Sequence, residues 1–176
     1  LADARHYPAI AWSDSFSDYV GIVSEWWAEH VSVKWAAYRA EALDLLTQAD
    51  ELARIVNLVG PEALSRQQRW VLEMARLIRE GLLQQSAIDE IDSYASVEKQ
   101  FELLKLMHDT YKLGRFLLDE GVPVQVLLEV PQLPRIIRAK SLFGNDELEG
   151  IRNLGAEVQA AFDAIRGEYD QVEKMQ

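Results

Sequence analysis

Apolar residues recur every three or four positions along almost the whole chain, and few residues interrupt this pattern. Only 9 glycines and 5 prolines are spread over the 176 residues. A spacing of three and four places side chains on one face of an α-helix, whereas a half-buried strand would need strict alternation. The sequence therefore predicts an all-α fold, a helical bundle of about six or seven helices with short turns.

The first breaks in the pattern separate two helices. One is expected to begin near Ser13 or Ser15 and to end near His30, and the next begins near Ser32 after a very short turn. Glycine and proline at positions 60 and 61 stop the second helix. Its predicted core stripe consists of Trp35, Tyr38, Ala42, Leu45, Ala49, Leu52, Val56 and Val59.

Serine residues mark the starts of the next two helices. Ser65 followed by Gln68 has the form of a capping box, in which each side chain satisfies a backbone N–H of the first turn. This helix should run to about Gly81. Ser96 can cap a further helix that ends at Gly121 and has apolar residues on both sides.

Prolines then shorten the elements before one long final helix. Pro123 suits a first helical position, and two later prolines confine the following segments to short helical pieces. The final helix is expected to begin near Asn145 or Asp146. We expect its apolar stripe to pack in the core, with a partner coiled coil as the alternative; the stripe consists of Leu148, Ile151, Gly155, Val158, Phe162, Ile165, Tyr169 and Val172.

Residues 1–12 lack the helical period. The segment His6-Tyr7-Pro8-Ala9-Ile10 combines proline with aromatic side chains, so we expect an extended junction. The chain begins with Leu1 rather than methionine, which suggests a piece of a longer protein. The expected organisation is a junction over residues 1–12, leading from a preceding domain, and a helical bundle domain over residues 13–176.

The charge balance excludes several classes of partner. The chain has 18 lysines and arginines against 29 aspartates and glutamates, a net charge of −11, and no cysteine. An acidic chain lacks the basic face that nucleic-acid binding needs, so we expect no nucleic-acid partner. No apolar run approaches the ~18 residues of a membrane span, so we expect no direct membrane insertion. The absence of cysteine suits a reducing cytoplasm.

The chain shows no catalytic motif of its own. It has no glycine-rich loop followed by lysine and serine or threonine, so no phosphate cradle is expected. No pair of Glu-x-x-His motifs supports a metal site in a bundle. Asp89, Glu90 and Asp92 form an acidic cluster, which we interpret as a solvated turn rather than an acid pair or a metal site.

Several short motifs occur in a fixed order along the chain. They are Arg5-His6-Tyr7-Pro8-Ala9-Ile10, Trp12, the region of Tyr19, Trp26-Trp27, Ile55-Val56, Val59-Gly60-Pro61-Glu62-Ala63-Leu64, Gln84-Gln85, Asp89-Glu90-Ile91-Asp92 and Glu98-Lys99-Gln100. In this order, and over nearly the whole chain to about Lys140, they resemble the C-terminal helical domain of the catalytic A (alpha) subunit of vacuolar-type and archaeal-type rotary ATPases, the V-type ATP synthase alpha chain.

The resemblance implies a function for the longer protein. Catalytic subunits of this family and non-catalytic B subunits alternate around a central stalk, and they couple ATP turnover to proton or sodium transport. ATP or ADP and Mg²⁺ bind to the full-length subunit, whose phosphate-binding loop and catalytic carboxylate lie in the preceding nucleotide domain. The resemblance therefore implies no catalytic residue, cofactor or metal within this chain. It also implies a cytoplasmic place, peripheral to the membrane, in the soluble ATPase sector.

The resemblance also implies two sets of site residues. Tyr7 matches an aromatic residue, usually phenylalanine, that packs on adenine. Gln84, Gln85, Ala87 and Ile88 match a second adenine-side segment, where Ile88 replaces the usual phenylalanine and cannot stack as a ring does.

The second set is the turn before Ser65, which the resemblance places against the central stalk. Glu62 would supply charge, Leu64 an apolar contact, and Ala63 and Arg66 further contacts there. A basic flank would consist of Arg66, Arg69 and Arg76.

Two other classes of function remain open from the residues alone. A stand-alone helical adaptor or scaffold would use the stripe of the final helix to bind a partner helix. A regulatory bundle that binds a small ligand is suggested by the five tryptophans.

Overall fold

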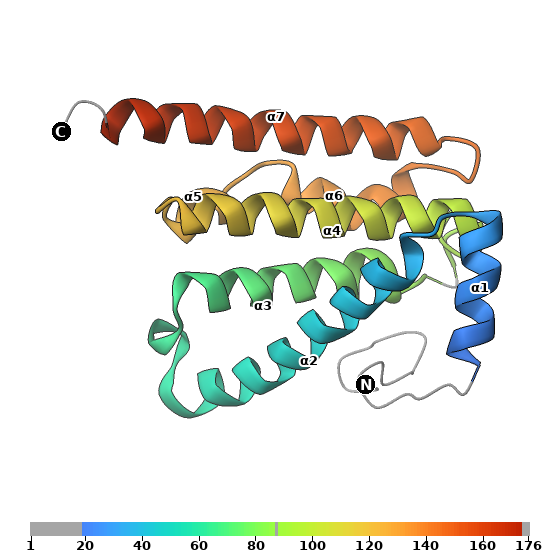
Figure 1. The fold of residues 1–176 in the computed structure, drawn as a ribbon, viewed down its shortest axis with the longest axis horizontal. Helices are drawn as coiled ribbons and strands as arrows, with labels where there is room; N and C mark the ends of the chain where they lie inside the picture. The colour runs from blue at the N-terminus through green and yellow to red at the C-terminus, as the bar shows by residue number, and fades with distance from the viewer. Residues whose placement is uncertain (1–18, 87, 174–176) are drawn as a thin grey trace.

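The computed structural model describes residues 19–86 and 88–173, and these residues form a helical bundle (Figure 1). Its α-helices are α1 (Val20–His30), α2 (Trp35–Val59), α3 (Arg66–Ile78), α4 (Val97–Asp119), α5 (Val124–Leu128), α6 (Leu133–Leu142) and α7 (Leu148–Glu173). A 3-10 turn, Pro61–Ala63, joins α2 to α3, and a π-helical turn, Arg79–Leu83, follows α3. No strand occurs in this part of the chain, so the predicted all-α fold is confirmed.

The helices pack in layers around α3 and α4. Figure 1 shows α3, α4 and α7 with nearly parallel axes, α3 running opposite to the other two, and α4 contacts both of its neighbours. The short helices α5 and α6 contact α3, while α2 packs on α3 at an angle and α1 lies across one end. The core consists of apolar side chains from α2 to α7.

The predicted capping residues begin and end the helices as expected. Ser65 Oγ accepts the Gln68 N–H at 3.2 Å, and Gln68 Oε1 accepts the Ser65 N–H at 2.9 Å. Ser96 Oγ accepts the Lys99 N–H at 3.2 Å at the start of α4. Gly121, with φ of +98°, follows the end of α4 in a conformation that glycine adopts at little cost.

Some predicted helix boundaries differ from the structure. Pro123 precedes α5 as its N-cap rather than occupying the first helical position. The final helix begins at Leu148, because Glu147 bonds back to Gly144 in a turn that delays the helix. The predicted start of the first helix, Ser13 or Ser15, lies outside the described residues.

The two predicted stripes differ in how far they are buried. In α7, Ile151, Val158 and Phe162 are each 1% exposed, so this part of the stripe packs in the core as predicted and is not available to a partner helix. In α2 the stripe is buried at its centre, but Val59 is 63% exposed, so its predicted core role is wrong. The reason is visible in Figure 1, where α2 diverges from α4 toward its C-terminal end.

A tight helix–helix contact in the core joins α3 to α4. Trp70 is 1% exposed, and its Nε1 donates to the carbonyl of Tyr111 at 3.2 Å. A Cβ added to Gly114 would lie 2.2 Å from Cζ2 of Trp70, far inside van der Waals contact. The indole ring therefore occupies the space that any side chain at position 114 would need.

We expect Gly114→Ala to destabilise the chain by about 1–3 kcal/mol, because a buried indole cannot move away from the added methyl group. Gly167→Ala in α7 is the matched control, since nothing lies within 4 Å of its added Cβ. The control should be neutral or stabilising by up to about 1 kcal/mol through helix propensity. Urea unfolding followed by circular dichroism measures the free energy of unfolding of both variants. Equal changes in the two variants would show that the contact between α3 and α4 is not tight.

Candidate functional site

The segment that follows α3 reaches the end of the bundle through a π-helical turn. The Gln84 N–H donates to the carbonyl of Arg79 at 2.7 Å, which closes this turn. Gly81 allows the turn to pack closely, since an added Cβ would lie 2.8 Å from Met107 Cε and 3.1 Å from the Ile137 Cα of α6. Such turns are frequent at functional sites.

The predicted adenine-side residues lie only partly within the described chain. Gln84 and Gln85 are half-buried and follow the π-helical turn directly. Ile88 is 94% exposed, so its side chain is largely uncovered by the residues that the structure describes. Tyr7 and Ala87 lie outside the described residues, and their roles remain predictions.

A buried ion pair holds the backbone of this segment. Lys140 Nζ donates to the carbonyl oxygen of Gln84 and lies 3.5 Å from Asp92 Oδ2. The same carboxylate oxygen accepts the Ser86 N–H at 2.6 Å. The segment is therefore fixed at both ends of Gln85 by main-chain hydrogen bonds to charged groups.

The acidic cluster differs from the predicted solvated turn. Asp92 is only 3% exposed, because its charge is satisfied by Lys140 and by a backbone amide, so the prediction is wrong for this residue. Asp89 caps the turn, with Oδ1 accepting the N–H groups of Ile91 at 2.9 Å and Asp92 at 3.3 Å. Glu90 is exposed, as predicted. The described residues contain no cluster of three side chains able to hold a metal ion.

A second lysine lies beneath the first, and sequence reasoning gave it no role. Lys99 is 0% exposed, and its Nζ donates to the carbonyls of Lys140 at 2.7 Å and Ile91 at 3.3 Å. Burial lowers the pKa of this ammonium group below its usual value, against the opposing effect of nearby carboxylates. The sequence carried a signal, because Lys99 shares the helix face of Leu103 and Leu106.

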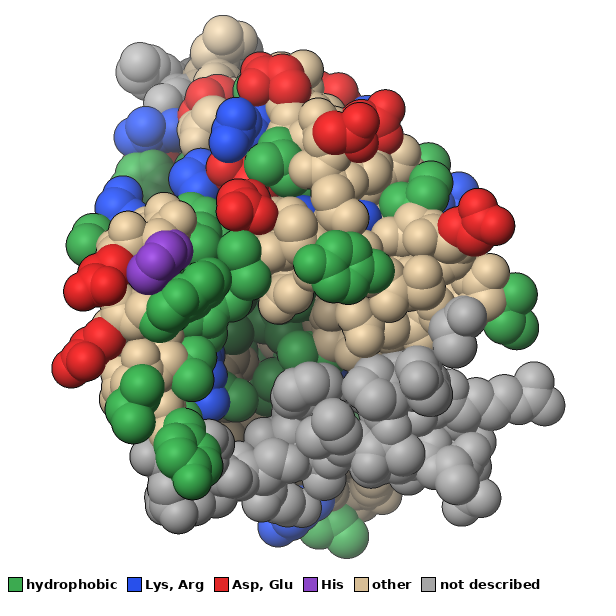
Figure 2. All heavy atoms as spheres, turned by 90° about the vertical axis from the view of Figure 1, so that its right-hand side faces the viewer, with side chains coloured by type: hydrophobic (Ala, Val, Ile, Leu, Met, Phe, Trp, Pro, Cys, Tyr) green, Lys and Arg blue, Asp and Glu red, His purple; other side chains and the backbone are tan. Residues whose placement is uncertain are grey.

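A cavity of about 550 Å³ opens beside this segment. Leu46, Leu82 and Leu103 contribute apolar walls, and Gln85 and Lys140 contribute polar groups. Figure 2 views this end of the bundle and shows hydrophobic side chains gathered around a hollow. The surface beside Gln85 is thus concave and partly apolar, as a site for a planar base requires.

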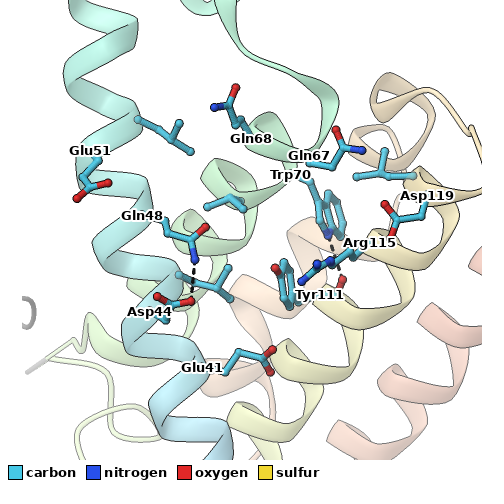
Figure 3. Close-up of a pocket in the computed structure, with 14 residues that line it drawn as sticks. Glu41, Asp44, Gln48, Glu51, Gln67, Gln68, Trp70, Tyr111, Arg115 and Asp119 are labelled. Carbon is cyan, nitrogen blue, oxygen red and sulfur yellow. Dashed lines mark hydrogen bonds between the residues drawn. The ribbon is translucent and has the colours of Figure 1, made fainter.

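A second cavity of about 550 Å³ lies between the diverging α2 and α4 (Figure 3). Glu41, Asp44 and Glu51 of α2 line one side, and Arg115 and Asp119 of α4 line the other. Figure 3 shows these side chains along the rim, with the indole of the core tryptophan between the helices. Carboxylates outnumber cations here, so this groove would repel a nucleotide's phosphates.

The turn predicted to contact the stalk has one buried member. Glu62, Ala63 and Arg66 are exposed, whereas Leu64 is 6% exposed and belongs to the core. Leu64 therefore packs the turn against the core, and its contact with a partner stays a prediction.

The predicted basic flank has less unpaired positive charge than expected. An exposed apolar surface also lies near the turn. Arg76 pairs with Glu73 at 2.5 Å and with Glu80 at 3.3 Å, so its charge is already matched. Leu58 and Val59, at the end of α2, are 84% and 63% exposed. These two side chains form an exposed apolar surface next to the turn.

Comparison with known proteins identifies the family. Residues 24–118 match the family model for the C-terminal domain of V and A type ATP synthase. The V-type ATP synthase alpha chain of Nitrosococcus oceani is 54% identical over 175 residues, which cover 99% of this chain and 30% of that protein. The A subunit of the A-type ATP synthase of Ignicoccus hospitalis is 44% identical over 158 residues, 89% of this chain and 26% of that protein.

The chain therefore belongs to the family of V and A type ATP synthase C-terminal domains, as the order of its motifs indicated. It spans less than a third of the length of these curated relatives. No helix in the described ranges combines the length and the apolar character needed to cross a membrane.

The acid sensitivity of the Asp89 cap can be measured directly. The N–H groups of Ile91 and Asp92 hold the pKa of the Asp89 carboxyl below its usual value. At pH values between the lowered pKa of the folded chain and the usual pKa of the unfolded chain, the unfolded chain binds more protons. The stability that the Asp89 charge contributes is therefore present above about pH 4 and is lost below it.

We expect Asp89→Asn to unfold at lower urea concentration than wild type at pH 6, and the gap to narrow as the pH falls from 4 to 3. Glu90→Gln, which changes an exposed neighbouring carboxylate, is the control and should show no such trend. A gap that stays constant from pH 7 to pH 3 would rule out a charge-dependent cap.

Proposed function

We propose that this chain is the C-terminal helical domain of the catalytic subunit of a V/A-type ATP synthase, and that it closes the adenine side of the nucleotide site. The observation that carries this proposal is the fixed backbone of Gln84 and Ser86 beside a partly apolar cavity. The exposed side chain of Ile88 lies in the same segment. An apolar side chain that is 94% exposed is suited to contact a bound base or a neighbouring domain.

The remaining machinery would belong to the rest of the subunit. The phosphate-binding loop, the catalytic carboxylate and the Mg²⁺ that accompanies ATP or ADP would come from the preceding nucleotide-binding domain. Residues 1–12 would form the junction to it, with Tyr7 against adenine, and residues 13–176 the bundle. This chain alone would therefore hydrolyse no ATP, because phosphoryl transfer needs that loop and metal.

The proposed partners follow from the same assignment. The domain would lie next to the central-stalk subunits and a non-catalytic B subunit, in the cytoplasmic sector peripheral to the membrane. The turn between α2 and α3 would contact the stalk through Glu62, Ala63 and Arg66, beside the exposed Leu58 and Val59. Its movement would couple ATP turnover to proton or sodium transport.

The adenine contact can be tested with two substitutions in the full-length subunit. Tyr7→Ala should weaken ATP binding by about 1–3 kcal/mol, the range for aromatic stacking on a base. Ile88→Ala should weaken it less, since an aliphatic side chain only packs on the ring. Leu128→Ala in α5, at the opposite end of the bundle and 38% exposed, is the control. Equilibrium titration with a fluorescent ATP analogue measures all three, and wild-type affinity in the first two would refute the contact.

The stalk contact calls for a change that spares the core. Replacing Glu62 and Ala63 with glycine while keeping Leu64 removes the exposed contacts and leaves the buried anchor. A single exposed contact contributes only about 0–1 kcal/mol to the interaction with a partner, so both residues are replaced together. We expect lower torque in single-molecule rotation with unchanged ATP binding. Wild-type torque, with the same unfolding midpoint, would remove the turn from the coupling pathway.

A further inference from the structure

We propose that Lys99, Lys140 and Asp92 form a buried clamp whose role is to position the Gln84–Ser86 backbone for the nucleotide base. These three are positioning residues, since they act on the segment rather than on the nucleotide. The inference rests on the proposed function, and it adds the residues that set the geometry of that site.

The outer part of the clamp is the pair of Lys140 and Asp92. Their side chains are only 13% and 5% exposed. Lys140 Nζ holds the Gln84 carbonyl, and Asp92 Oδ2 holds the Ser86 N–H at 2.6 Å. Hydrogen bonds to ionised partners are stronger than neutral ones, and the two side chains also form an ion pair at 3.5 Å.

The inner part of the clamp is Lys99, which fixes Lys140 itself. Its Nζ donates to the Lys140 carbonyl at 2.7 Å, in the last turn of α6. A continued helix would have given this carbonyl the N–H of Gly144, but that group donates to Glu147 Oε2 at 2.8 Å. The ammonium group thus replaces a missing backbone donor, at the helix end that favours a cation.

The chemistry of the clamp indicates positioning rather than simple packing. Burying charged groups is costly, and apolar residues of similar volume fill a core at least as well. Four main-chain groups are bonded here, three carbonyls and one N–H, so the clamp fixes backbone positions whatever the side chains of the segment are. Gln85, between the two anchored residues, lines the cavity beside the segment.

The test uses the assembled ATP synthase complex with Lys140→Met in the full-length subunit. Lys105→Met is the matched control, because Lys105 is a lysine of α4 with a 44% exposed side chain, and its ion pair among the described residues lies within its own helix, with Asp109 at 3.2 Å. We expect faster hydrogen exchange in peptides covering residues 84–92 and a KM for ATP raised about tenfold with little change in kcat. The preference for ATP over GTP should fall, which a merely structural defect would not cause.

A second variant keeps the test possible if the complex that contains Lys140→Met does not assemble. Asp92→Asn keeps an acceptor for the Ser86 N–H but removes the charge that pairs with Lys140. Asp92→Asn should change the hydrogen exchange rate, the KM for ATP and the preference for ATP over GTP in the same direction as Lys140→Met, by smaller factors. Wild-type exchange over residues 84–92 in either variant would overturn the clamp.

Gln85→Ala separates this inference from the proposed function. If Gln85→Ala alters KM and base preference but Lys140→Met alters neither, the segment lies at the base and the clamp does not position it. If neither variant changes KM or base preference, the adenine contact itself is wrong, and the positioning role is overturned with it.

Discussion

The contact of Trp70 with Gly114 sets the geometry on which the rest of the bundle depends. The indole occupies the space that a side chain at position 114 would need, so any larger residue there would push α3 and α4 apart. Because α3 passes directly into the π-helical turn, its position against α4 also fixes where that turn ends. Gly81 then lets α6 approach the turn, which brings Lys140 within reach of Gln84.

The two ends of the bundle are consequently different in character. At one end, α3, α4 and α6 converge, and buried charges hold an irregular segment in a single backbone conformation. At the other end α2 diverges and leaves Leu58 and Val59 exposed. The first arrangement suits a binding surface that must keep its shape, and the second suits a surface that is completed by a partner.

The sequence predicted those parts of the fold that depend on neighbouring residues. The capping box of Ser65 and Gln68 and the end of α4 just before Gly121 involve residues within a few positions of each other, so they could be predicted. The exposure of Val59 could not, because helical period shows which residues share a face but not how far along the helix that face stays covered. The burial of Leu64 likewise depends on the core beneath the turn.

The candidate site was predictable only in outline. The order of the motifs located Gln84 and Gln85, but the groups that hold them come from far along the chain. Lys99 and its carbonyl partner Lys140 are 41 residues apart, and Lys140 and Gln84 are 56 apart. A lysine on an apolar helix face indicates burial but does not identify its partner.

The most direct measurement of the adenine contact is photolabelling of the full-length subunit with 2-azido-ATP, followed by peptide mapping. The proposed site predicts labelling at Tyr7 or within residues 84–88, and labelling confined to residues outside this chain would contradict it.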